Sequence, residues 1–199
     1  MKERGTLRPG GMEFTHLMLD LANFPSGARL LDVCCGAGTT VEMLLNSGFN
    51  AWGIDLDAMT EDLPLVRGSA YDLPCMDASL DGILCECGFS SLEPDTALEE
   101  FARVLKSGGT LLISDLYSRA EGGHVGVLRV HTRERFERLL AKHGFELQIF
   151  ADHTDALKSF LARQIMERGC DWLRGELRLD PSKMQPLKCG YCVFMARKL

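Results

Sequence analysis

The chain has 199 residues, of which 46% are hydrophobic, so a single domain with a sizeable core is expected. Its formal net charge of -6 disfavours a general nucleic-acid or anionic-membrane surface. The first residues, MKERGTLRPGG, contain no apolar signal core, and no apolar run approaches the length of a membrane span. Eight cysteines without a secretion signal indicate free thiols in a reducing compartment. These features predict a cytoplasmic protein with neither nucleic acid nor membrane as a partner, and they leave its oligomeric state open.

Near the start of the chain, apolar residues recur at helical spacing. They predict an amphipathic helix over about residues 11–23, which stops near Pro25. The apolar face of this helix consists of Phe14, Leu17, Met18 and Leu21. The residues ahead of it, Arg8-Pro9-Gly10-Gly11, are predicted to form a flexible loop.

The strongest pattern begins with a buried strand. Leu30 to Val33 form a short apolar run, typical of a parallel strand that is covered on both faces. Gly36-Ala37-Gly38 follow as a tight turn, where the missing side chains let backbone N–H groups approach a ligand. Thr39 or Thr40 is expected to cap the next helix, and Gly48 to end it.

A second strand over residues 51–54 leads to Asp55 at its C-terminal tip. A carboxylate at that place accepts hydrogen bonds from the two hydroxyls of a ribose. Dinucleotide sites carry a further glycine three residues after the turn, but this chain has Val41 there. The pattern therefore favours a nucleoside cofactor without a pyrophosphate and disfavours an NAD-dependent dehydrogenase.

At this point the sequence carries a family resemblance. Asp32-Val33-Cys34-Cys35-Gly36-Ala37-Gly38 resembles the D-x-G-x-G-x-G motif of class I S-adenosylmethionine-dependent methyltransferases, in particular the type 11-like group. Cys34 stands where that family usually has its first glycine, and it is expected to narrow the methionine end of the pocket. The resemblance implies S-adenosyl-L-methionine as cofactor. The residues that it implies for cofactor binding are Asp32, Cys34, Gly36, Ala37, Gly38, Asp55, Leu56, Ser69, Ala70 and Glu86.

The resemblance also implies the fold: an α/β, Rossmann-like sheet of seven mostly parallel strands with an antiparallel last strand and helices on both faces. Residues 1–199 would form one such domain. The helix at about 11–23 and a helical insertion at about 154–187 would cover the cleft. Burial of one side of the domain, without ligand contact, is an equal alternative for the first helix.

After Asp55, residues 57–62 are predicted to make one helical turn, and Leu65-Val66 a brief third strand. The segment Gly68-Ser69-Ala70-Tyr71-Asp72-Leu73-Pro74 resembles the family's G-D-A-x-x-L-P stretch, whose acid accepts from the adenine amino group. Ser69 replaces that acid here, and its hydroxyl can still accept. Asp72, reaching in from a shifted loop, is the less favoured adenine contact.

The fourth strand is predicted from Leu80 to Cys87. Ligands of open parallel sheets sit beyond the carboxyl ends of the strands, so Glu86 is the best-placed acid for the acceptor side. The alternative interpretation of Glu86 is a structural one, in which backbone N–H groups hold its carboxylate at the end of the strand. Strand alternation sends Cys85 and Cys87 to one face and Glu86 to the other.

The rest of the chain alternates helices and strands, and the run from Ser79 to Asp115 resembles the same family in the same order. The predicted elements are a helix at Pro94–Lys106 stopped by Gly108-Gly109, a fifth strand at Thr110–Ser114, a helix at Thr132–His143, a sixth strand at Phe145–Phe150, an inserted helix at Thr154–Arg168 capped by Thr154, an irregular stretch at 170–188 and an antiparallel last strand at Gly190–Arg197.

The cysteine spacings raise the question of a metal. Cys189 and Cys192 are spaced as C-x-x-C, but on a strand their side chains diverge, so a zinc site is disfavoured and no metal is predicted. Buried cysteines that act as small hydrophobes are the default. In the alternative, Cys85 or Cys87 together with Cys34 or Cys35 binds a thiophilic substrate such as arsenite.

The predicted chemistry is methyl transfer from the sulfonium of S-adenosylmethionine to an unidentified small-molecule acceptor. Because the donor is already activated, the protein has mainly to align the reactants and exclude water. A base is needed only if the acceptor arrives protonated, and the candidates are Glu86, Tyr117 and His153, the last with Asp155 nearby. The alternatives are a non-catalytic S-adenosylmethionine sensor or interaction module, and a thiol or metalloid acceptor held by Cys85 and Cys87.

Overall fold

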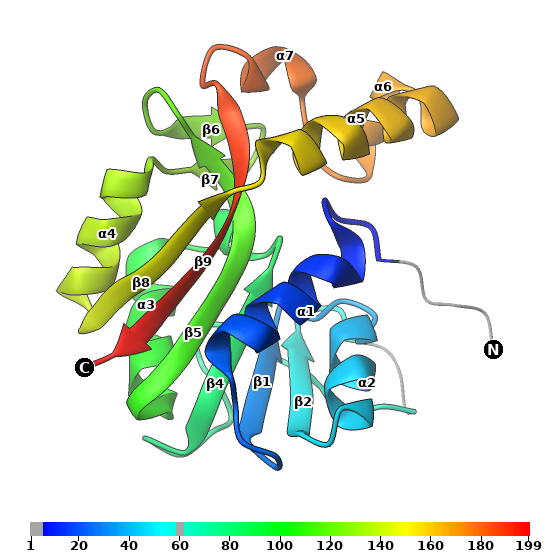
Figure 1. The fold of residues 1–199 in the computed structure, drawn as a ribbon. Helices are drawn as coiled ribbons and strands as arrows, with labels where there is room; N and C mark the ends of the chain where they lie inside the picture. Colours follow the sequence, from blue (N-terminus) through cyan, green and yellow to red (C-terminus); the bar gives the residue numbers. More distant parts are fainter. Residues whose placement is uncertain (1–5, 59–61) are drawn as a thin grey trace.

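The protein folds around one seven-stranded sheet with helices on both faces (Figure 1), as the computed structural model shows for residues 6–58 and 62–199. The predicted turn at 57–62 thus falls partly outside the described residues. The spatial order of the strands is β3-β2-β1-β4-β5-β9-β8. Their bounds are β1 Arg29–Val33, β2 Asn50–Asp55, β3 Leu65–Arg67, β4 Leu80–Glu86, β5 Leu105–Ser118, β8 Phe145–Asp152 and β9 Cys189–Lys198.

Strand direction confirms the predicted fold class. The strands from β3 to β5 pair in parallel, whereas β9 is antiparallel to both β5 and β8. Because parallel strands need crossover connections, the helices α2 (Thr39–Asn46) and α3 (Pro94–Val104) lie between strands along the chain. The carboxyl ends of β1, β2 and β4 consequently meet at one edge of the sheet.

Both faces of the sheet are buried, which explains the continuous apolar runs of its strands. Leu31 and Ile83 point into one core layer with Phe101 of α3, where α4 (Arg133–Lys142) also packs. Leu30 and Leu84, one position along, point into the opposite layer, beneath the helix α1 (Gly11–Ala22). Full burial of one such leucine contributes about 1.5–3 kcal/mol.

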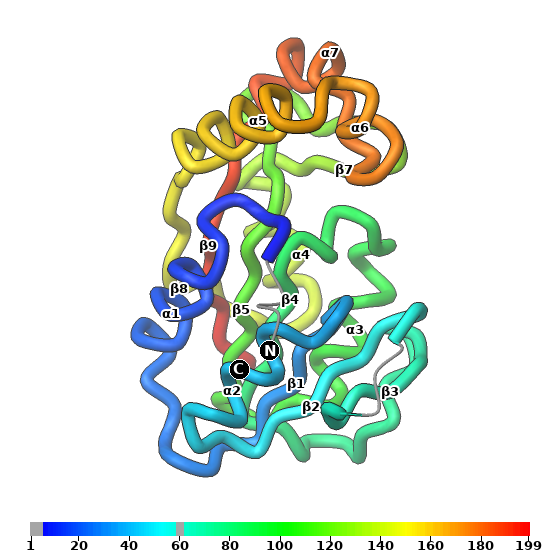
Figure 2. The backbone as a smooth tube through the Cα atoms, turned by 90° about the vertical axis from the view of Figure 1, so that its right-hand side faces the viewer, coloured from blue at the N-terminus to red at the C-terminus, as the bar shows by residue number. Residues whose placement is uncertain are grey.

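A third apolar cluster joins a separate cap to the sheet. The cap consists of the hairpin β6 (Gly123–Val125) and β7 (Leu128–Val130) and the helices α5 (Thr154–Arg168), α6 (Cys170–Gly175) and α7 (Pro181–Met184). Figures 1 and 2 show these elements together at the end of the sheet where the parallel strands finish. Leu157 and Met184 from the cap pack there with Leu116 of β5 and Tyr191 of β9. None of the helices in the described part of the chain is long and apolar enough to cross a membrane.

Several local predictions were wrong. β6, β7, α6 and α7 were not foreseen, because each is short and offers too few periodic residues. β5 begins at Leu105, which pairs with Leu80, so Gly108 and Gly109 lie in an irregular start of the strand rather than ending a helix.

The predicted caps of two helices were also wrong. α2 begins after Gly38, whose φ of 79° makes the turn, and no side chain caps it. The Thr40 hydroxyl instead donates to Glu86. α5 begins after His153, and Thr154 places its hydroxyl on Asp152 rather than on the helix end.

Candidate functional site

The glycine turn and Asp55 form one hydrogen-bonded unit at the carboxyl ends of β1 and β2. The Gly36 N–H donates to one Asp55 oxygen at 2.9 Å, and the Asp57 N–H donates to the other, also at 2.9 Å. Gly38 is required there, because a Cβ at that position would lie 2.9 Å from the side chains of Leu63 and Leu65. Each Asp55 oxygen keeps a further lone pair for a ligand hydroxyl.

The loop after β3 lies beside this unit. Ser69 accepts a hydrogen bond from the Tyr71 N–H at 3.1 Å, so its hydroxyl stabilises the loop turn. Ala70 is buried, whereas the Leu56 side chain is 67% exposed at the end of β2. Asp72 is exposed on the same loop, and its N–H donates to the Ser69 carbonyl.

Cys34 takes the left-handed backbone conformation, with φ of 61°, which a glycine would adopt at less cost. Its side chain lies against Gly88, where an added Cβ would come within 2.5 Å of the Cys34 Cβ. The same point lies 3.2 Å from the Cys85 sulfur. Cys34 is therefore accommodated by Gly88, which leaves room for it between β1 and β4.

Two carboxylates are buried next to the turn. Asp32 is only 3% exposed, and within the described residues no hydrogen bond to its carboxylate is found. Burial raises the pKa of Asp32 well above its ordinary value, the nearby Glu86 raises it further, and Arg8 opposes this rise. Burial also raises the pKa of Glu86, against the lowering effects of Arg8, Thr40 and Thr15.

Glu86 is held by a polar network that sequence analysis missed. Arg8 lies 2.9 Å from a Glu86 oxygen, and the hydroxyls of Thr15 and Thr40 donate to the same carboxylate at 3.0 and 2.9 Å. The predicted flexible loop at residues 8–11 is in fact a turn, closed by a 3.2 Å hydrogen bond from the Gly11 N–H to the Arg8 carbonyl. The glycine pair was the signal that the chain folds back here.

On the cap side, α1 separates the candidate bases. Phe14 packs against His153 with the rings tilted by 49° and their centroids 4.4 Å apart, while Thr15, the next residue, donates to Glu86. The His153 Nε2 atom is buried and has no hydrogen-bond partner within the described part of the chain. Tyr117 lies apart from Glu86, and burial together with Asp152 raises the pKa of Tyr117 to about 12.

The thiols of Cys85 and Cys87 do not share a face of the sheet, contrary to prediction. β4 ends at Glu86, and Cys87 adopts φ of 55°, which breaks the alternation. Cys85 is fully buried, and its pKa is raised well above the ordinary value by a hydrogen bond with Cys34 and by burial. Cys87 instead lies 3.0 Å from the Tyr191 hydroxyl. In the described ranges, no group of three or more His, Cys, Asp or Glu side chains could hold a metal ion.

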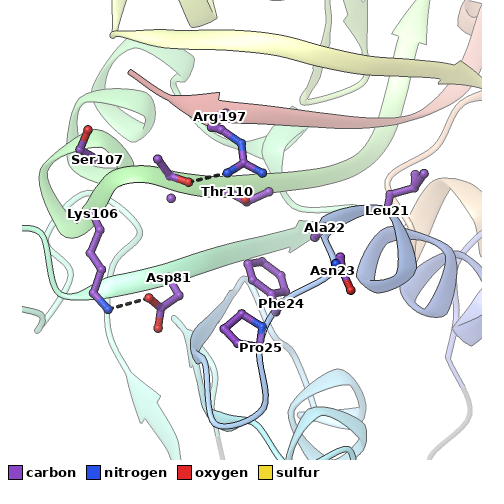
Figure 3. Close-up of a pocket in the computed structure, with 12 residues that line it drawn as sticks. Leu21, Ala22, Asn23, Phe24, Pro25, Asp81, Lys106, Ser107, Thr110 and Arg197 are labelled. Atoms are coloured by element: carbon purple, nitrogen blue, oxygen red, sulfur yellow. Dashed lines mark hydrogen bonds and ion pairs between the residues drawn. The ribbon is translucent and has the colours of Figure 1, made fainter.

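A pocket of about 420 Å³ lies at the opposite end of the sheet, away from these residues (Figure 3). It lies between the end of α1 and the start of β5. Its charged groups are already paired, since Lys106 contacts Asp81 at 2.6 Å and Arg197 donates to the Gly108 carbonyl at 3.1 Å. The candidate site is therefore the edge that carries Asp32, Asp55 and Glu86.

The strand order and the glycine turn define a class I methyltransferase fold. Residues 31–113 match the family described as "Methyltransferase domain". Over this region the chain is similar to the class I S-adenosylmethionine-dependent methyltransferases, as its motifs predicted. The matched region ends in β5, so the cap lies outside it.

Relatives with known names match about half of the chain. The demethylmenaquinone methyltransferase of Renibacterium salmoninarum is 31% identical over 108 residues, which cover 50% of this chain and 46% of that protein. The ubiquinone/menaquinone biosynthesis C-methyltransferase UbiE of Campylobacter jejuni is 31% identical over 117 residues, or 51% of this chain and 50% of that one. The chain thus spans about half the length of the curated relatives that it matches.

Solved structures resemble nearly the whole chain. Geranyl diphosphate C-methyltransferase from Streptomyces coelicolor A3(2) has a TM-score of 0.78 at 14% identity, covering 92% of this chain and 78% of that one. The [4+2]-cyclase SpnF has a TM-score of 0.73 at 23% identity, covering 94% and 80%. A transferase and a cyclase therefore share this architecture, so the fold alone does not specify the reaction.

Proposed function

We propose that this protein binds S-adenosylmethionine and transfers its methyl group to a small-molecule acceptor in the cytoplasm. The observation that carries the proposal is the buried Asp32 carboxylate. It lies next to the glycine turn without a hydrogen bond in the described residues and shares its surroundings with Glu86 and one cation, Arg8. A ligand that carries positive charge would balance this excess of buried negative charge.

The residues present fit the cofactor in chemistry as well as in charge. Asp55 accepts from the ribose hydroxyls, and the glycine turn admits the ligand close to the backbone. Asp32 would accept from the ammonium group, since this acid is buried beside the glycine turn. Ser69 accepts from the adenine amino group, with Ala70 and Leu56 against the ring. The cofactor supplies an activated methyl group on a sulfonium.

The cap side provides the acceptor site. Phe14, His153 and Tyr191 form an aromatic group beneath α5, in which the Phe14 ring centroid lies 4.4 Å from that of His153 and 6.0 Å from that of Tyr191. The cap excludes water there, which favours methyl transfer over side reactions. His153 is the base for an acceptor that arrives protonated, because its Nε2 atom has no competing partner in the described chain. Tyr117, with its raised pKa, stays protonated, and its one hydroxyl proton is donated to Asp152, so we do not assign it the role of base.

Glu86 has a different role from the base expected of it. Its carboxylate is already bound by Arg8, Thr15 and Thr40, so it has little freedom to accept a proton from an acceptor. We place it on the cofactor side, as a fixed negative charge near the sulfonium. The names of the relatives, which include quinone and geranyl diphosphate methyltransferases, support a small acceptor.

Ligand-dependent melting tests the cofactor. S-adenosylhomocysteine is expected to raise the melting temperature, whereas NAD at equal concentration is not, because only a ligand of the folded state stabilises it. A shift with NAD alone would overturn the proposal.

Labelling tests turnover. Methyl-tritiated S-adenosylmethionine, added with the protein to a cell extract, is expected to label small molecules and to yield S-adenosylhomocysteine. His153→Ala should reduce labelling by about 10²–10⁴-fold without changing S-adenosylhomocysteine affinity. Binding without any turnover would favour a sensor.

A further inference from the structure

Arg8 reaches the site because of a tight turn ahead of α1. Gly10 and Gly11 have φ of 72° and 51°, a conformation that side chains rarely adopt. A Cβ on Gly10 would lie 2.3 Å from the Phe14 ring, so only glycine fits between this turn and α1. The turn places the Arg8 side chain beneath α1 instead of in solvent. An arginine side chain only 12% exposed is unusual enough to need a reason.

One end of the guanidinium is fully used by the protein. Nη2 donates to the Thr15 hydroxyl at 2.6 Å and the Thr40 hydroxyl at 3.1 Å, and lies 2.9 Å from a Glu86 oxygen. Nε is directed to the Gly11 carbonyl at 3.4 Å. For Nη1, in contrast, no hydrogen bond to a described residue is found. Among the described residues, the network thus fixes the plane of the guanidinium and leaves the two Nη1 N–H donors for a ligand.

The order of the strands indicates which end of the cofactor would lie beside the Nη1 donors of Arg8. Asp55, the ribose acid, ends β2, while Glu86 ends β4, and β1 lies between them in the sheet. A cofactor with its ribose at Asp55 would extend across β1 past Asp32 toward Glu86, which would bring its amino-acid end beside Arg8. That end carries a carboxylate, which Asp32 and Glu86 both repel. A buried carboxylate needs a cation or hydrogen-bond donors.

We infer that Arg8 binds the carboxylate of the cofactor's amino-acid end through Nη1, and that the Glu86–Thr15–Thr40 network orients it for this contact. The inference rests on the proposed function. It goes beyond the sequence motifs, which begin at Asp32 and do not include Arg8, and it assigns the turn at residues 8–11 to cofactor selection. Cofactor analogues without the carboxylate should gain nothing from Arg8.

Decarboxylated S-adenosylmethionine is the matched probe, because it keeps the sulfonium, the ribose and the ammonium and lacks only the carboxylate. Calorimetry would compare it with S-adenosylmethionine on the wild type and on Arg8→Met. The variant is expected to bind S-adenosylmethionine about 10- to 100-fold more weakly, because it loses a hydrogen bond between two charged groups. Its affinity for the decarboxylated compound should change less than about threefold. Arg138→Met, at an exposed position on α4, controls for net charge.

Each possible result of these measurements either supports or overturns the role of Arg8. If Arg8→Met weakens both ligands equally, Arg8 only supports the fold of the site and the inference is overturned. If the wild type binds neither ligand, the proposed function itself fails, which is a distinguishable result. Arg8→Lys keeps the buried charge if Arg8→Met does not fold, and the ratio of the two affinities can be read on it equally. The wild-type ratio retained in that variant would also count against the inference, because a lysine cannot hold Glu86 and the carboxylate with a planar fork.

Discussion

The cofactor half of the molecule, residues 31–113, and the cap differ in how far apart in sequence their contacting residues lie. In the cofactor half, residues close in sequence make the site: Gly36 donates to Asp55 across one helix and one strand. At the cap, residues far apart in sequence meet, as Phe14 does with His153 and Tyr191. The first arrangement follows from local turn chemistry, whereas the second requires the complete fold. For this reason, family motifs identify the donor of a reaction sooner than its acceptor.

The largest effect is expected from separating the cap from the sheet. Leu157 is 2% exposed and packs in the cluster that joins them, so Leu157→Ala should lower the free energy of unfolding by about 2–5 kcal/mol. Urea unfolding would measure this. Hydrogen exchange should quicken at 123–130 and 154–184 first, while S-adenosylhomocysteine affinity stays within about twofold. An equally large loss of that affinity would show that the two halves are not separable.

The next effect concerns the cofactor half alone. Asp55→Ala should weaken S-adenosylmethionine binding by about 1.5–3 kcal/mol, the contribution of hydrogen bonds to a charged group. The Gly36 N–H also loses its acceptor, so a small loss of stability should accompany it. Calorimetry on the folded variant checks the value. Unchanged affinity would remove Asp55 from the ribose site.

Asp32→Asn should separate binding from stability. In the unliganded protein the buried Asp32 charge is unfavourable, so the variant should be more stable than the wild type at neutral pH, by about 1–3 kcal/mol. The same variant should bind the cofactor more weakly, because an amide does not balance an ammonium group. Melting without ligand and calorimetry with it would measure the two effects. A variant less stable than the wild type would contradict this account of Asp32.

The pH dependence of stability follows from the same group. Because the folded-state pKa of Asp32 lies above the ordinary 3.8, the folded state binds more protons than the unfolded state. Burial likewise raises the pKa of Asp115 to about 6. The free energy of unfolding should therefore fall as pH rises from about 4 through about 6. Denaturant titrations at several pH values check the sign, and Asp32→Asn should flatten the slope.

The smallest effect is expected at Cys34. Replacing it by glycine relieves the left-handed backbone but removes a side chain that fills the space at Gly88. Each effect is worth about 1 kcal/mol, and they oppose one another. Cys34→Gly should therefore change S-adenosylhomocysteine affinity by less than about threefold. A gain of tenfold would show that Cys34 narrows the cofactor pocket, as the motif comparison predicts.

The two regions also differ in how much of their structure could be predicted from the sequence. The five parallel strands and Asp55 were predictable, because strand, turn and acid follow in a fixed local order. The ion pair of Arg8 with Glu86 was not, because 78 positions of chain separate the two residues and only the folded α1 brings them together. Cys87 was misjudged for another reason: strand alternation holds only while the strand continues, and β4 ends one residue earlier. The roles of Glu86, Tyr117 and His153 remain predictions.

The position of β9 has a consequence for how the chain assembles during synthesis. β9 emerges from a ribosome after the other six strands of this sheet, yet it lies inside the sheet, where Thr110 pairs with Arg197 and Phe145 with Lys198. Until it arrives, β5 presents an unpaired hydrophobic edge and β8 has no sheet to join. The nascent protein thus depends on the ten residues of β9 to close its sheet, a stage at which chaperones would find their target.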